Sequence, residues 1–321
     1  MFDGYQRCFA SVKRILVPAR RQAQNRHSAM QILSIQSQVV FGHVGNSALG
    51  FPLQRLGHDV WSVPTALLSN HAGYPDIGGQ VLAPELVDGL LNGLARRKAF
   101  GHCDLVVTGY LGSGDVASVV ADAVLRVRAA NPNVVYCCDP IIGDREQGIY
   151  VDRGIPEIIG SRMLPVADII TPNLFELEVL CGLATNALTH GGASAITAAA
   201  RDLLARMRPG ACCLVTSAAH GDVGPSNVSV MAVSAASAWE VETPRLDFLV
   251  EPHGAGDLMC GLFAAAFVRH GEMSRALEES VARVFALLAE THRRGDAELV
   301  LVAAGDVIVA PEQQFAARMV G

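Results

Sequence analysis

Lysine is almost missing from this sequence. Only Lys13 and Lys98 are lysines among the 25 basic residues of a 321-residue chain, so mechanisms that need a catalytic lysine are nearly excluded. Long apolar runs are missing as well: the most apolar stretch, Leu258–Val268, has 11 residues, whereas roughly 18 are needed to span a bilayer. We therefore expect no membrane partner. A hydrophobic share of 50% also excludes a disordered chain.

Several common motifs are absent too. None of the eight cysteines forms a Cys-x-x-Cys pair, which leaves no spacing for a zinc site or a disulfide framework. We interpret them as buried, reduced thiols of a cytoplasmic protein. There is no Gly-x-x-x-x-Gly-Lys-Ser/Thr loop, and no Gly-x-Gly-x-x-Gly follows the first predicted strand. Because the formal charge is −6 and no long basic run follows residue 30, we expect no nucleic acid partner.

The first 30 residues differ in charge from the rest. They hold six basic residues and one acid, a net charge of +5, which leaves −11 for residues 31–321. We predict that residues 1–29 form a basic, disordered extension, or that Met30 is the effective start, and that residues 30–321 form one domain. An Arg-rich, acid-poor targeting segment and a functional basic arm are the alternatives.

From Met30 onward, short apolar runs alternate with longer amphipathic segments. The predicted strands are Gln31–Gln36, Asp59–Pro64, Asp104–Thr108, Val134–Cys138, Ile169–Thr171, Cys212–Thr216 and Val228–Val233. The predicted helices are Pro84–Arg97, Gly114–Arg128 and Ser194–Met207. In the first of these helices the spacing places Leu86, Leu90, Leu91 and Leu94 on one face, and Ser194 is the expected N-cap of the last. The alternation predicts a single α/β domain whose mostly parallel sheet is covered on both faces.

Polar and glycine residues follow several of the predicted strands. Ligands of open parallel sheets bind beyond the carboxyl ends of the strands, so these residues are expected to line one continuous crevice. They are Ser37, Ser69–Tyr74, Gly109–Ser113, Asp139–Asp144, Thr171–Glu176 and Thr216–Ser217.

Two glycines precede an apolar, Ala-rich helical segment. In Gly254-Ala255-Gly256-Asp257, the glycines let successive N–H groups point at one spot, and the helix N-terminus adds unpaired donors and partial positive charge. This predicts an anion hole that needs no lysine. Asp257 is either an acid that stabilises the helix dipole or the base that takes a proton from a substrate hydroxyl, which then attacks a bound phosphoryl group.

A second motif, Asn-x-x-Glu, stands at a strand-to-helix junction. Asn173 and Glu176 can form a helix cap with an acid in the first turn. They can also be functional, with Glu176 positioning hydrated Mg²⁺, an ion that prefers oxygen and water ligands.

These residues resemble the ribokinase-like superfamily and, within it, the pyridoxal kinases, over about residues 31–315. Gly254–Asp257 and Asn173–Glu176 are marks of the superfamily. The marks of the narrower family are Leu33–Ser37, Gly42–Asn46, Ser69–Tyr74, Thr108–Tyr110 and Cys138–Asp144. The resemblance implies a ribokinase-like three-layer α/β/α fold and transfer of the ATP γ-phosphate to the 5′-hydroxyl of pyridoxal, pyridoxine or pyridoxamine. It also implies Mg²⁺, K⁺ as a further ion, and a homodimer.

Site roles follow from the resemblance position by position. Asp257 matches the base, and Gly254, Ala255 and Gly256 match the anion hole. The positions that match the pocket for the vitamer are Ser37, His71, Ala72, Gly73 and Tyr74. The positions that match the ATP site are Asp139, Asp144, Thr171, Asn173, Glu176, Thr216, Ser217, Thr243, Pro244, Arg245 and Leu246. Asp139, Thr171 and Glu176 match positions near the metal, and Asp144–Asp152 resembles the flap over ATP, with glycines that suit mobility.

Two positions depart from the family pattern. Ala72 stands where pyridoxal kinases often have threonine, so one hydroxyl contact to the ring edge is missing. His253 replaces the small apolar residue expected before the glycines, either as a packed histidine or as a group near the phosphates that makes activity sensitive to pH. A hydroxymethylpyrimidine kinase of thiamine synthesis and a non-catalytic vitamer-binding regulator are the alternative functions.

Overall fold

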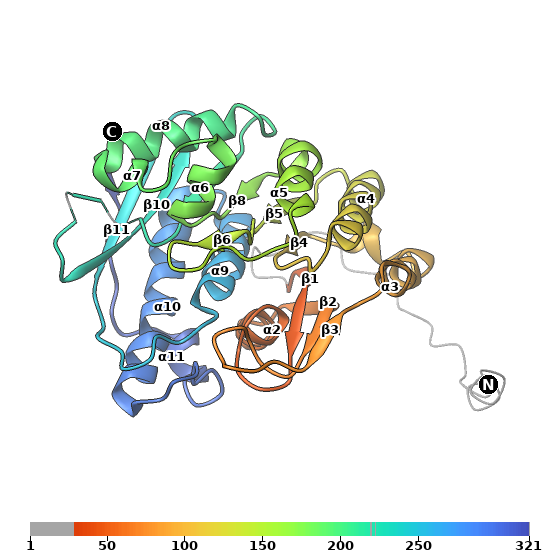
Figure 1. The fold of residues 1–321 in the computed structure, drawn as a ribbon, viewed down its shortest axis with the longest axis horizontal. Coiled ribbons are helices and arrows are strands. Elements are labelled where there is room, and N and C mark those ends of the chain that lie inside the picture. The colour runs from red at the N-terminus through yellow and green to blue at the C-terminus, as the bar shows by residue number, and fades with distance from the viewer. Residues whose placement is uncertain (1–28, 219, 222, 321) are drawn as a thin grey trace.

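The computed structural model describes residues 29–218, 220–221 and 223–320, so nearly all of the predicted basic extension lies outside the described residues. A ten-stranded sheet crosses the molecule in the order β12-β11-β10-β9-β8-β5-β4-β1-β2-β3 (Figure 1). Its strands are β1 (Gln31–Val39), β2 (Asp59–Leu68), β3 (Gly79–Val81), β4 (Leu105–Thr108), β5 (Val135–Cys138), β8 (Ile169–Ile170), β9 (Cys212–Val215), β10 (Asn227–Ser234), β11 (Ala238–Pro244) and β12 (Arg318–Met319).

The centre of this sheet is parallel and both of its edges are antiparallel. Strands β9, β8, β5, β4, β1 and β2 pair in parallel, whereas β10, β11, β12 and β3 join antiparallel. A separate hairpin of β6 (Gly143–Asp144) and β7 (Gly148–Ile149) lies within the predicted flap. The carboxyl ends of all the parallel strands therefore lie on the same side of the molecule, as the alternation of strands and helices predicted. We call this line of strand ends the carboxyl edge of the sheet.

Helices cover both faces of the sheet. One face packs against α3 (Pro84–Arg96), α4 (Gly114–Ala130), α5 (Gly154–Ile158), α6 (Leu174–Cys181), α7 (Ala187–His190) and α8 (Gly192–Leu204). The other packs against α2 (Asn46–Arg55), α9 (Ala255–His270), α10 (Met273–Arg294) and α11 (Gly305–Val309). Strand β1 shows how the chain separates two cores, because Leu33 and Ile35 enter the first core while Ile32 enters the second. The predicted three-layer α/β/α architecture is confirmed.

Three short helical turns complete the first layer. They are η2 (Ala99–His102), the π-helical turn η3 (Ile159–Met163) and η4 (Leu164–Val166). The helices also correct two details. In α3 the buried residues are Val87 and Leu91, whereas Leu86 is 51% and Leu90 42% exposed, because the face that contacts the sheet is narrower than the leucine spacing indicated. Helix α8 begins two residues early, and Ser194 is not its N-cap.

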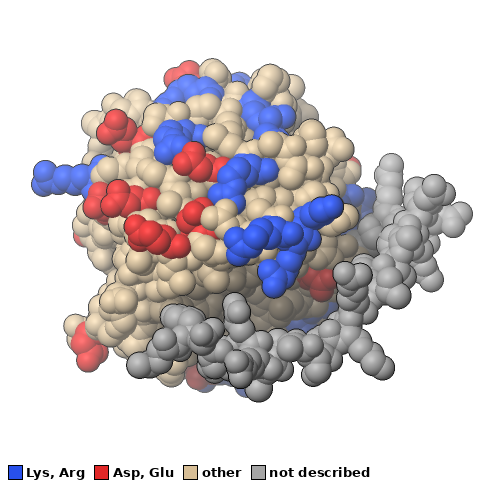
Figure 2. Space-filling model, turned by 90° about the vertical axis from the view of Figure 1, so that its right-hand side faces the viewer, with Lys and Arg blue, Asp and Glu red and all other residues tan. Residues whose placement is uncertain are grey.

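The described cysteines have the placement that the sequence predicted. The described cysteines are all free, and every one except Cys181 is buried. In the described part of the chain, no helix combines the length and apolar character needed to cross a membrane. On the side where α3 and α4 lie, Lys and Arg alternate with Asp and Glu (Figure 2), and two of the pairs formed there are Arg126–Asp88 and Arg162–Asp122.

Candidate functional site

The carboxyl ends of the parallel strands bring several predicted residues together. Asp139 follows β5 and Thr171 follows β8, and the Thr171 hydroxyl donates to the Asp139 carboxylate at 2.9 Å. Thr216, directly after β9, forms a parallel bridge with Asn173. Asp139 and Thr171 are both buried, so polar groups from three neighbouring strands meet at one edge of the sheet.

The Asn-x-x-Glu motif forms a complete capping box at the start of α6. The Glu176 N–H donates to the Asn173 side chain at 2.9 Å, and the Asn173 N–H donates to the Glu176 carboxylate at 2.9 Å. The second Glu176 oxygen accepts from the N–H of Ile142 at 2.9 Å, and the Asn173 amide donates to the carbonyl of Gly143 at 2.9 Å. The cap prediction is confirmed, and the cap also holds the base of the flap.

Three acidic side chains at the carboxyl ends of the strands are buried where their ionised forms are disfavoured. We call Asp139, Glu176 and Asp257 the carboxylate cluster. Burial raises the pKa of Glu176 to about 7, against the N–H donors that lower it. Burial raises the pKa of Asp257 to about 6, and burial together with Cys260, Glu176 and Asp257 raises that of Asp139. Crowded, desolvated carboxylates of this kind are stabilised by a cation.

The N-terminus of α9 has the tight geometry that the glycines predicted. Gly254 caps the helix with φ 94°, and a Cβ atom there would lie 1.8 Å from the carbonyl oxygen of His43, so only glycine fits. Ala255 and Gly256 begin the helix, and Asp257 stands in its first turn. The N–H groups of Gly45 and of Asp257 itself donate to the Asp257 carboxylate. The helix N-terminus thus offers free donors beside an acid with a raised pKa.

Near α9, strand β1 and helix α2 fix the position of Ser37. Ser37 is buried, and a Cβ atom on Gly45 would lie 2.4 Å from its carbonyl oxygen. Ser37 lies within β1 and does not follow the strand as predicted, because β1 continues to Val39. Asn46 anchors this part of β1: its side chain accepts from the Ser34 hydroxyl at 2.7 Å and donates to the Gln36 carbonyl at 2.9 Å. Gly45 therefore connects Ser37 with the Asp257 carboxylate.

A cluster of rings stands on the β2 side of this edge. We call His71, Tyr74, His253 and Glu298 the histidine wall. Glu298 accepts from His71 Nε2 at 2.8 Å and from the Tyr74 hydroxyl at 2.7 Å. The ring centroid of His71 lies 4.3 Å from that of His253 and 4.8 Å from that of Tyr74. The sequence reasoning missed Glu298, because no motif surrounds it and it is far from His71 in the chain.

The flap reaches the carboxylate cluster. Burial and then the charges of Glu176, Asp144 and the rest of the cluster raise the pKa of Tyr150, just after β7. Arg145 in the same hairpin lies 3.6 Å from the buried carboxylate of Glu178 on α6. The sequence reasoning named the segment but neither of these side chains, since their roles depend on how the hairpin folds back onto α6.

Of the other predicted residues, Gly73 contacts the histidine wall, since its N–H donates to Nδ1 of His71 at 3.2 Å. The Arg245 side chain donates to the carbonyl of Pro225 at 3.2 Å and its N–H to that of Ser226 at 2.7 Å, so the predicted run Thr243–Leu246 contacts the loop before β10. Ala72 and Gly73 are exposed in the loop after β2. Ser217 adopts a left-handed backbone with φ 49° directly after Thr216.

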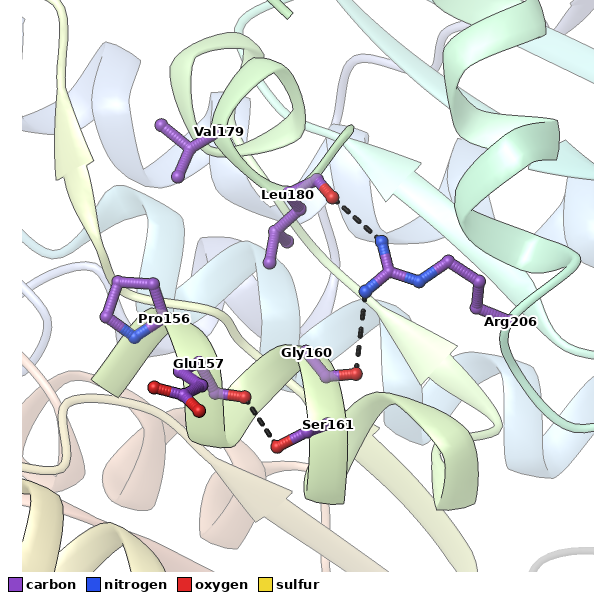
Figure 3. Close-up of a pocket in the computed structure, with 7 residues that line it drawn as sticks. All are labelled: Pro156, Glu157, Gly160, Ser161, Val179, Leu180 and Arg206. Atoms are coloured by element: carbon purple, nitrogen blue, oxygen red, sulfur yellow. Dashed lines mark hydrogen bonds between the residues drawn. The ribbon is translucent and has the colours of Figure 1, made fainter. Parts of the chain in front are cut away.

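A hollow of about 320 Å³ lies away from all of these motifs (Figure 3). Its lining residues are Pro156, Glu157, Gly160, Ser161, Val179, Leu180 and Arg206. Arg206 donates to the carbonyls of Leu180 and Gly160, and the Ser161 hydroxyl donates to that of Glu157 at 2.7 Å (Figure 3). Because these polar groups already have partners within the protein, we assign the chemistry to the strand ends and not to this hollow.

Comparisons with known proteins find kinases of two names. The sequence profile of a family described as phosphomethylpyrimidine kinase matches residues 82–300. A curated relative from Leifsonia xyli, named pyridoxal kinase PdxY, is 43% identical over 91% of this chain and 100% of its own length. A relative of the same name from Deinococcus radiodurans is 43% identical over 90% of this chain and 96% of its own.

Solved structures give the same result at lower identity. Pyridoxal kinase from Leishmania donovani in complex with ADP and ginkgotoxin has a TM-score of 0.80 and 28% identity, and the match covers 91% of this chain and 99% of that one. The same kinase in complex with ADP and pyridoxine has a TM-score of 0.80 and 27% identity, over 92% of this chain and 100% of that one.

Proposed function

The chain belongs to the pyridoxal kinase family, and from this premise we propose that it phosphorylates the 5′-hydroxyl of pyridoxal, pyridoxine or pyridoxamine with ATP. The observation that carries the proposal is the pairing of free N–H donors at Gly254–Gly256 with the Asp257 carboxylate in the first turn of α9. One part holds a phosphoryl group and the other accepts a proton within the same helical turn.

Asp257 acts as the base in this proposal. Its raised pKa of about 6 lets it accept the proton of the 5′-hydroxyl and still be mostly ionised at neutral pH. The oxygen then attacks the γ-phosphorus, the bond from that phosphorus to the leaving oxygen of ADP breaks, and the N–H groups of Gly254, Ala255 and Gly256 hold the developing charge. No covalent intermediate on the protein is needed.

Mg²⁺ fits the residues at the strand ends. Among the described residues no three His, Cys, Asp or Glu side chains converge closely enough to hold a bare ion. Both Glu176 oxygens already accept backbone N–H groups, so we propose that Glu176, Asp139 and Thr171 hold the ion mainly through water. When bound, Mg²⁺ supplies positive charge to the nucleotide phosphates. We retain K⁺, a homodimer and a cytoplasmic location as further proposals from the resemblance.

Hydroxymethylpyrimidine phosphorylation is the second candidate. It is supported by the match to the phosphomethylpyrimidine kinase profile and by Ala72, which offers no hydroxyl to a ring edge. Both acceptors are flat heteroaromatic alcohols, so the same base and the same anion hole would serve either one.

One assay separates the candidates. The protein is incubated with Mg-ATP and, separately, with pyridoxal, pyridoxine, pyridoxamine or hydroxymethylpyrimidine, and ADP is followed, with Asp257→Asn as the control for background hydrolysis. Faster turnover of a B6 vitamer supports the proposal. Preference for hydroxymethylpyrimidine supports the second candidate. Pyridoxal binding without turnover of any acceptor would identify a non-catalytic regulator and overturn the proposal.

A further inference from the structure

The two imidazoles of the histidine wall differ in their partners: both ring nitrogens of His71 form hydrogen bonds within the protein, whereas the ring of His253 is exposed. The N–H of Gly73 donates to Nδ1 of His71 at 3.2 Å, so the proton of His71 is on Nε2, from which it is donated to Glu298 at 2.8 Å. Both ring nitrogens of His71 therefore have protein partners, and its ring is buried. His253, which packs against it, is exposed.

The absence of a side chain at Gly73 makes room for the ring of His253. A Cβ atom on Gly73 would lie 2.4 Å from Nε2 of His253 and 3.0 Å from Cε1 of His71, so the loop after β2 leaves room for both rings only because residue 73 has no side chain. The planes of the two imidazoles are inclined by 33°, with centroids 4.3 Å apart. This is a tilted contact in which the two rings lie close together.

The position of His253 in the chain places it beside the reacting groups. It immediately precedes Gly254, whose N–H-rich turn opens α9, and it is four residues before Asp257. Burial and then the charge of His71 lower the pKa of His253, against the charges of Glu298, Glu251 and Asp144, which raise it. His253 thus links the histidine wall, to which it belongs, to the first turn of α9.

We propose that His253 is a specificity-determining residue of this chain: the exposed imidazole, supported on one side by His71, is the surface on which a planar heteroaromatic alcohol stacks so that its hydroxyl faces Asp257. His71 and Glu298 are positioning residues that act through His253. A flat ring extends the stack, whereas a puckered sugar alcohol cannot. The inference rests on the proposed function and specifies how its acceptor is held.

Two substitutions of His253 test the stacking. His253→Ala is expected to raise the KM for pyridoxal about five- to tenfold, the usual size of one aromatic contact, while kcat and the KM for ATP change less than twofold. His253→Phe keeps a flat ring and is expected to restore the KM to within about twofold of the parent. An alanine variant with unchanged KM, a phenylalanine variant as weak as alanine, or a rise confined to the KM for ATP would each overturn the proposal.

Gly73→Ala provides an independent arm. The added methyl group should displace His253 and raise the KM for pyridoxal, but it should add less than twofold in the His253→Ala background, where the ring it displaces is gone. Equal effects in both backgrounds would contradict the mechanism. His102→Ala is the matched control, because His102 precedes β4 and lies at the opposite edge of the sheet.

Binding without ATP keeps this inference separate from the proposed function. Calorimetry with pyridoxine should show the same order, with the parent and His253→Phe binding more tightly than His253→Ala. If the parent protein turns over no vitamer but this order holds, the proposed function fails and the stacking inference stands. If the parent turns over pyridoxal and the order is absent, only the stacking inference fails.

Discussion

The carboxylate cluster and the histidine wall shift the pKa values of their acidic side chains in opposite directions. In the carboxylate cluster, burial is the main influence and raises the pKa of Asp139, Glu176 and Asp257. Burial also raises the pKa of Glu298 in the histidine wall, but hydrogen bonds from Tyr74 and His71 reverse the shift and leave that pKa lowered. In the first region burial outweighs the hydrogen-bond donors, whereas in the second the donors from Tyr74 and His71 to Oε1 of Glu298 outweigh burial, although Oε2 of Glu298 is buried without a hydrogen-bond partner.

This difference teaches which half of the site needs a ligand to be complete. The carboxylate cluster carries a destabilising concentration of buried negative charge that a cation and its phosphates would relieve. The side chains of the histidine wall already contact one another, so we expect this wall to keep its shape without a ligand. Changes in the carboxylate cluster should therefore alter chemistry and metal response, and changes in the histidine wall should alter affinity.

The largest expected effect is on catalysis. Asp257→Asn keeps the size of the side chain but removes the base, so we expect kcat to fall by about two to four orders of magnitude. Nucleotide affinity should change little, which equilibrium binding of ADP with Mg²⁺ would measure. Near-normal turnover in this variant would sink the assignment of Asp257 as the base.

The pH profile should show the same acid. With a pKa of about 6, Asp257 is ionised above that pH and able to accept a proton, so kcat/KM should fall about tenfold for each pH unit below 6 and level off above. Mg²⁺ favours the ionised cluster and should shift this acid limb to lower pH. The measurement is kcat/KM for pyridoxal from pH 4.5 to pH 8 at two Mg²⁺ concentrations, and an acid limb that ignores Mg²⁺ would contradict a cation at the cluster.

A smaller effect is expected at the histidine wall. Glu298→Ala leaves the Tyr74 hydroxyl and the His71 N–H without their acceptor, so the KM for pyridoxal should rise about tenfold with kcat within threefold. Glu298→Gln retains one acceptor oxygen and should be milder. The control is Glu290→Ala, whose carboxylate pairs with Arg293 and Arg294 on α10. A fall in kcat as deep as that of Asp257→Asn would erase the distinction between the two regions.

The last expected effect is on stability. The pKa of Asp257 is raised in the folded state from 3.8 to about 6, so this group favours folding below pH 3.8, and that contribution is lost as the pH rises through 6. At pH 8 without metal, Asp257→Asn should therefore be more stable by up to about 3 kcal/mol, because it removes an ionised, desolvated group. Urea unfolding at pH 8 and pH 5 measures this, and the gain should shrink at pH 5.

Sequence reasoning reached the carboxylate cluster more easily than the histidine wall. Asp139, Thr171 and Glu176 each stand within six residues of a strand end, so the parallel arrangement alone predicts that they meet. Glu298 lies 227 residues from His71, and only the packed fold brings these two side chains together. Its loop begins with Gly295, but that glycine only ends α10 and does not indicate a role for Glu298.

The outermost strands of the sheet could not be predicted from the sequence either. Strands β3 and β12 are short and mostly exposed, so no apolar alternation marks them, and they form only because β2 and β11 offer unpaired backbone groups. In α3 the exposure of Leu86 and Leu90 reflects the angle at which the helix meets the sheet, which the 3.6-residue period alone does not fix.

The capping box at Asn173 both begins helix α6 and holds the chain just before the flap. The groups that start α6 also grip the flap, through the Asn173 amide on Gly143 and the Glu176 carboxylate on Ile142. A mutation that frays the first turn of α6 would thus also loosen the base of the predicted flap. Substitutions at Asn173 are therefore constrained twice, because they change the helix start and the flap anchor together.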